Sequence, residues 1–119
     1  MVKYYYQNII ERLGIMAKTV HVSDINNLLK DDKTVLIDVR ETDELKETGY
    51  VPGAIHLPLT TFDVDDKDLR EHKGDTVYVM CRSGKRSERV QHMLIDEGYD
   101  AVNVEGGILE YEGDREELW

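Results

Sequence analysis

Residues 75–98 read DTVYVMCRSGKRSERVQHMLIDEG, and this stretch decides the fold class. Residues 75–80 are a short apolar run of the kind found in strands buried on both faces. Residues 87–97 carry apolar side chains at positions 90, 93 and 94, which fall on one face of a helix, and Gly98 marks its end. The only cysteine, Cys81, lies between the two, followed by a cationic, glycine-containing segment. The stretch therefore predicts a strand, a short loop that bears a thiol, and a helix.

The rest of the chain repeats this alternation. Further strands are predicted at 19–22, 34–39, 55–57 and 101–104, and helices at 24–30, with Ser23 as N-cap, and at 41–48, ended by Gly49. Residues 63–72 are too polar for the core, and we expect one short helix there. Strands that alternate with helices imply parallel pairing, because right-handed crossovers return the chain to the same edge. We therefore predict a single α/β domain with three layers, in which helices flank a mainly parallel sheet of about five strands.

Residues 1–17 stand outside this alternation. Apolar side chains recur there at helical spacing, at Tyr6, Ile9, Ile10, Leu13 and Met16. The pattern predicts an amphipathic helical extension that packs on the domain or mediates self-association. A start at Met16 would also give a self-sufficient domain. We assign no chemistry to this extension and expect the domain proper to span 18–119.

Composition limits the function classes. The 119 residues include 25 acidic and 15 basic side chains, for a net charge of −10, which disfavours nucleic acid as a partner. No apolar run approaches the roughly 20 residues needed to cross a bilayer, and the N-terminus lacks a signal-peptide core. One cysteine cannot form an internal disulfide. We expect a cytoplasmic protein that does not interact with membranes.

The residues around Cys81 favour an activated thiol. Arg82, Lys85 and Arg86 lie within five positions of it, and the helix that follows directs its positive end to the same place. Successive backbone N–H groups of residues 82–87 would form an anion-binding nest, and Gly84 would allow the backbone angles that such a curl needs. The sequence therefore predicts an activated sulfur rather than a buried, inert one. The four histidines are scattered, so we predict no metal site, and no motif indicates a cofactor.

Four separated blocks resemble a known family, the single-domain rhodaneses. LIDVRE at 36–41 resembles that family's first signature, GYVPGAI at 49–55 its second, CRSGKRS at 81–87 its active-site loop, and Gly106-Gly107 with Tyr111 its closing motif. The likeness runs from about residue 19 to about residue 111. Tyr50 replaces the usual histidine and Tyr111 the usual tryptophan, and both positions look structural.

The resemblance implies a sulfurtransferase that works through a persulfide on Cys81. A thiolate would take the outer sulfur of thiosulfate or another persulfide donor and pass it to cyanide, a thiol or a partner protein. Arg82 and Lys85 are candidates for guiding the anionic donor, and the backbone of Ser83, Gly84 and Ser87 completes the anion-binding loop. We expect Arg86 to support the loop by pairing with Asp38, and Arg40 to be structural.

Three other functions remain open at this point. Phosphatases and arsenate reductases also hold an anion in a cysteine loop, but they place an arginine six positions after the cysteine, where this chain has Ser87. The domain could also be a regulatory module without turnover. A persulfide relay, loaded by a cysteine desulfurase and discharged to a sulfur-acceptor protein, is the third. We expect a monomer or a weak homodimer.

Overall fold

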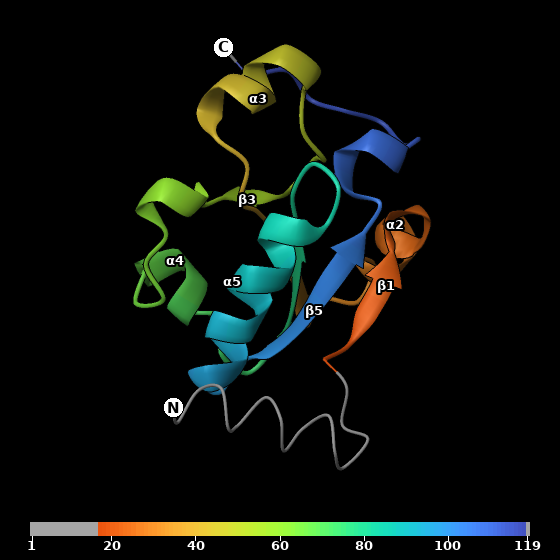
Figure 1. Ribbon diagram of the computed structural model, residues 1–119. Coiled ribbons are helices and arrows are strands. Elements are labelled where there is room, and N and C mark those ends of the chain that lie inside the picture. Colours follow the sequence, from red (N-terminus) through yellow and green to blue (C-terminus); the bar gives the residue numbers. More distant parts are fainter. Residues whose placement is uncertain (1–16, 119) are drawn as a thin grey trace.

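The computed structural model describes residues 17–118, and strands and helices alternate within that range (Figure 1). The strands form one sheet in which every pair of neighbours is parallel. Their order across the sheet is β1 (Thr19–His21), β5 (Asp100–Glu105), β4 (Thr76–Met80), β2 (Thr34–Asp38) and β3 (Ile55–His56). The predicted extension at 1–17 lies outside the described residues, except for its last position.

Helices cover the sheet on both faces, which confirms the predicted three-layer α/β class (Figure 1). The α-helices are α2 (Ile25–Leu28), α3 (Thr42–Thr48), α4 (Lys67–Arg70) and α5 (Lys85–Asp96). Three short 3-10 helices complete the list: η1 (Val22–Asp24), η2 (Leu59–Thr61) and η3 (Gly107–Glu110). No helix between residues 17 and 118 combines the length and apolarity needed to cross a membrane.

The core consists of two apolar clusters, one on each face of the sheet, because successive side chains of a strand point to opposite sides. The first cluster joins the central strands to α4 and α5 through Val35, Ile37, Val39, Leu69, Val77, Val79, Val90 and Leu94. The second joins them to η1, α2 and η3 through Val22, Ile25, Leu36, Tyr78, Met80, Val102, Val104 and Ile108. Cys81 continues the alternation of Val77 and Val79, so its side chain belongs to the α5 face.

Two local predictions were wrong. Leu69 is fully buried, so the polar segment 63–72 does contribute to the core. Ser23 does not cap a long helix, because it lies inside η1, where its backbone N–H donates to His21 Nδ1 at 3.1 Å. The imidazole therefore caps η1, and α2 is reduced to a single turn.

The carboxyl ends of the parallel strands meet at one edge, where ligands bind in open sheets of this kind. The loop after β4, helix α3 and η3 gather at this edge (Figure 1). The end of the chain also returns to it, because the backbones of Tyr50 and Glu116 exchange two hydrogen bonds of 2.9 Å.

Candidate active site

Cys81 lies immediately after β4, at the floor of a loop that continues directly into α5. The backbone N–H of Gly84 donates to its Sγ at 3.1 Å. Gly84 is the N-cap of α5. Its φ of 117° lies in the left-handed region, which residues other than glycine rarely adopt. The loop therefore turns an amide onto the sulfur only because a glycine stands three residues after the cysteine.

The sulfur is nevertheless buried, and here the sequence prediction was wrong. Cys81 is only 1% exposed. Arg82 and Lys85, which suggested an open site, are themselves exposed. The cationic side chains that neighbour Cys81 in sequence therefore lie at the exposed rim of the loop, while Cys81 itself is buried beneath it.

The pKa of Cys81 reflects opposing influences. Burial raises it, because a thiolate loses solvation in the interior. The Ser87 hydroxyl, when its hydrogen faces the sulfur, and the amides of Ser87, Gly84 and Ser83 lower it, and the balance falls below the ordinary value. The thiol is thus both buried and acidified, and the groups responsible are mainly dipoles of the loop itself.

A buried polar network lies beneath the loop. Ser87 Oγ is 3.4 Å from Cys81 Sγ and donates to Asn103 Oδ1 at 2.6 Å. Asn103 Nδ2 in turn donates to the carbonyl oxygen of Gly84 at 3.1 Å. Ser87 and Asn103 are 0% and 3% exposed, so α5, β5 and the loop are joined without solvent.

A backbone clamp holds the loop from the other side. Ile108 N donates to the carbonyl oxygen of Cys81 at 3.0 Å, and Leu109 N donates to that of Arg82 at 3.2 Å. Gly107, just before them, packs so closely on the same carbonyl groups that no side chain fits. The closing Gly-Gly pair therefore fixes the position of the cysteine loop.

Arg86 does not pair with Asp38, contrary to the sequence prediction. Its guanidinium donates two hydrogen bonds of 2.7 Å to the carboxylate of Glu44 in α3. Hydrogen bonding from Arg86 lowers the pKa of Glu44 to about 2, although partial burial acts in the opposite direction. Because this bidentate pair neutralises Arg86, the loop keeps Arg82 and Lys85 as its exposed cations.

Comparison with known proteins identifies the family to which this fold belongs. A family model described as "Rhodanese-like domain" matches residues 21–114. The chain belongs to the rhodanese-like domain family. The expected resemblance is therefore confirmed.

Relatives of this rhodanese-like domain include two proteins of Bacillus subtilis (strain 168). The chain is 39% identical over 84 residues to "Putative sulfurtransferase YtwF", covering 71% of this chain and 79% of that protein. It is 33% identical over 87 residues to "Putative sulfur carrier protein YrkF", covering 72% of this chain and 45% of that one. The crystal structure of a rhodanese-like domain protein from Staphylococcus aureus matches with a TM-score of 0.71 and 30% identity, over 86% and 99% of the two chains. The chain thus spans most of the first relative but less than half of the second.

Asp38 and Arg40 form a buried pair that supports the edge of the rhodanese-like fold. Arg40 donates to Asp38 at 2.8 Å, and both side chains are 1% exposed. Arg40 also donates to Thr48 Oγ1 at 2.7 Å and to the carbonyl oxygen of Gly49 at 3.0 Å. The pair joins β2 to the end of α3, and a structural role for Arg40 stays a prediction.

Sequence reasoning missed two residues of this site. Glu44 is the N3 residue of a capping box with Glu41, which offered a sequence signal for its helical position but none for its contact with Arg86. Asn103 carried a weaker signal, since it is an amide within an otherwise apolar predicted strand. A buried amide in such a strand needs partners, and Ser87 and Gly84 supply them.

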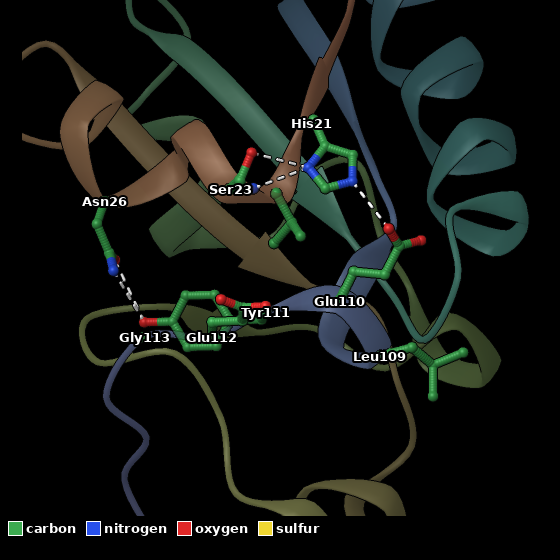
Figure 2. Close-up of a pocket in the computed structure, with 9 residues that line it drawn as sticks. His21, Ser23, Asn26, Leu109, Glu110, Tyr111, Glu112 and Gly113 are labelled. Atoms are coloured by element: carbon green, nitrogen blue, oxygen red, sulfur yellow. Dashed lines mark hydrogen bonds and ion pairs between the residues drawn. The ribbon is translucent and has the colours of Figure 1, made fainter.

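A separate cavity of about 430 Å³ lies beside η3 (Figure 2). Cys81 is not among its lining residues. His21 bonds Ser23 Oγ at 2.9 Å and Glu110 Oε1 at 3.0 Å across it, and Asn26 Nδ2 donates to the Tyr111 hydroxyl at 3.2 Å. These side chains satisfy one another, and residues 17–118 contain no cluster of histidine, cysteine or carboxylate groups suited to a metal.

Proposed function

We propose that this rhodanese-like domain is a sulfurtransferase that carries a sulfane sulfur on Cys81 as a persulfide. The observation that carries the proposal is the thiol itself, which is buried yet acidified by the Ser87 hydroxyl and the amides of its own loop. A thiolate is the nucleophile that sulfur transfer requires. The relatives named for sulfur transfer and sulfur carriage support the same chemistry.

The reaction would take place in two displacements. The Cys81 thiolate attacks the outer sulfur of thiosulfate, the sulfur–sulfur bond breaks, and sulfite leaves with the electron pair. An acceptor nucleophile then attacks the terminal sulfur of the persulfide. Cyanide would leave as thiocyanate, and the Cys81 thiolate would be restored. No electrons are gained or lost overall, because the sulfane sulfur only changes its partner.

The loop suits an anionic donor and an anionic intermediate. Amides that favour the thiolate can also stabilise the persulfide anion, since both place negative charge inside the loop. The exposed side chains of Arg82 and Lys85 would attract the donor to the rim. Because Cys81 is 1% exposed, the loop residues above it must move aside before the donor reaches the sulfur.

The burial of the sulfur gives specific support to a second candidate, a persulfide relay. A docked cysteine desulfurase could open the loop, and an acceptor protein could discharge it, in the cytoplasm. The chain has one cysteine, so discharge requires an external thiol or protein. Efficient loading by a desulfurase with slow turnover on thiosulfate would favour the relay.

Phosphatase chemistry has less support. The sixth position after Cys81 holds Ser87, which is buried against Asn103. The nearest arginine, Arg86, is paired with Glu44. Neither Ser87 nor the paired Arg86 therefore offers the unpaired guanidinium that such enzymes direct at a phosphate.

Intact-mass analysis tests the proposal. Incubation with thiosulfate should add about 32 mass units, one sulfur atom, and later addition of cyanide should remove it and release thiocyanate. The Cys81→Ser variant, checked for folding by circular dichroism, should gain nothing. A wild-type protein that stays unmodified with both thiosulfate and a cysteine desulfurase would refute the proposed function, and an equal gain in Cys81→Ser would remove Cys81 from it.

A further inference from the structure

The hydroxyl of Ser87 has one hydrogen and two neighbours that could accept it. Asn103 Oδ1 lies 2.6 Å from Ser87 Oγ, and Cys81 Sγ lies 3.4 Å away. A serine hydroxyl donates a single hydrogen bond, so it cannot serve both at once. The contact that favours a thiolate therefore competes with a shorter contact to the amide.

The orientation of the Asn103 amide is fixed by its other partner. The carbonyl oxygen of Gly84 can only accept, so the group that faces it at 3.1 Å must be Nδ2. The acceptor Oδ1 then faces Ser87, and it can only receive the Ser87 hydrogen. In this arrangement Ser87 Oγ offers a lone pair to Cys81, which suits a protonated thiol.

We propose that Asn103 is a positioning residue that holds the hydroxyl hydrogen of Ser87 away from the Cys81 sulfur and so limits how readily the thiol ionises. When the thiolate forms, the hydrogen must leave Asn103 to reach the sulfur, and a buried Oδ1 is left without a donor. The backbone N–H groups of the loop provide the rest of the stabilisation of the thiolate. The inference rests on the proposed function for its role in sulfur transfer, but its physical content concerns the free thiol alone.

Charged groups near Cys81 affect the same equilibrium and must stay constant in any test. Those at this edge include Arg82 in the loop, Lys85 and Arg86 in α5, Glu41 and Glu44 at α3, Asp38 at the end of β2, Arg40 after it, Glu105 at the end of β5 and Glu110 in η3. Asn103 itself is uncharged. A substitution by leucine, which has a similar shape, changes hydrogen bonding and leaves every charge in place.

The direction in which the pKa of Cys81 changes distinguishes a positioning role of Asn103 from a purely structural one. Asn103→Leu frees the Ser87 hydrogen for the thiolate, so the pKa of Cys81 should fall by about one unit, a tenfold change in ionisation. If Asn103 only supports the loop through the Gly84 carbonyl, its loss should loosen the loop and withdraw the Gly84 amide from the sulfur. The pKa of Cys81 would then rise.

The test is the NMR titration of isotope-labelled Cys81 Cβ, which gives one signal because the chain has one cysteine. We expect a lower pKa in Asn103→Leu, and no such fall when the same change is made in a Ser87→Ala background, where no hydroxyl can be redirected. A pKa that is unchanged or raised, or an equal fall in both backgrounds, would overturn the inference. If Asn103→Leu fails to fold, Asn103→Ala gives the same comparison. The titration needs no sulfur donor, so a protein that accepts no sulfur would defeat the proposed function and leave this result intact.

Discussion

The clamp on the cysteine loop predicts that Gly107→Ala is unusually damaging. Gly107 has φ of 52°, where a residue with a side chain is strained. A methyl group there would also overlap the backbone carbonyl groups of Cys81 and Arg82. To relieve the overlap, η3 must move away, which stretches the hydrogen bonds from Ile108 and Leu109 that hold the loop.

The magnitude follows from the two penalties. The left-handed conformation costs about 1–2 kcal/mol for a residue other than glycine. Overpacking a site that is already filled costs about 1–3 kcal/mol more. We therefore expect Gly107→Ala to lower the free energy of unfolding by about 2–5 kcal/mol.

Gly53→Ala is the matched control. Gly53 has a similar positive φ of 85°, but nothing lies within 4 Å of the added methyl group. This variant should lose only about 1–2 kcal/mol, the cost of the backbone conformation. Urea unfolding followed by circular dichroism measures both variants, provided that the slope with denaturant is unchanged. If Gly107→Ala is no less stable than Gly53→Ala, the close packing of η3 on the loop does not stabilise the protein as argued.

Three further predictions test the remaining contacts. Glu44→Gln should cost about 1–2 kcal/mol at neutral pH after allowance for solvent screening. The pKa of Glu44 in the folded protein, about 2, lies below its ordinary value of 4.5, so this cost should be present above pH 4.5 and vanish as the pH falls towards 2. A difference in urea unfolding that does not change with pH would contradict the ion pair between Glu44 and Arg86. Asp38→Ala should cost about 3–5 kcal/mol in the same assay, because it leaves Arg40 buried without its counter-ion, and a loss below about 1 kcal/mol would show that the pair is dispensable. Arg82→Ala should raise KM for thiosulfate more than Arg86→Ala does, since Glu44 already neutralises Arg86; steady-state thiocyanate assays that give the reverse order would exclude Arg82 from donor capture.

Much of the fold could be predicted from the sequence, because it depends on local patterns. The apolar runs predicted at 34–39 and 75–80 contain the paired central strands β2 and β4, and this pattern was enough to place Cys81 just after a strand. Gly49 ends α3 as predicted. These features follow from side-chain periodicity and from backbone preferences of single residues.

The parts that could not be predicted depend on contacts between distant segments. Arg86 could have paired with Asp38 or with Glu44, and only the position of α3 over the loop decides for Glu44. The burial of Cys81 depends on how the loop folds over it, whereas the neighbouring cations indicated only the charge of the rim. Asn103 acquires its role because β5 lies beside β4, a pairing of residues that are far apart in the chain.

The most direct test of the account is the titration of the Cys81 thiol in the unmodified wild-type protein, by the same Cβ resonance. Loop hydrogen bonds that outweigh burial predict a pKa below that of free cysteine titrated under the same conditions. A pKa at or above that value would contradict the account, because burial would then dominate and the thiol would stay protonated near neutral pH.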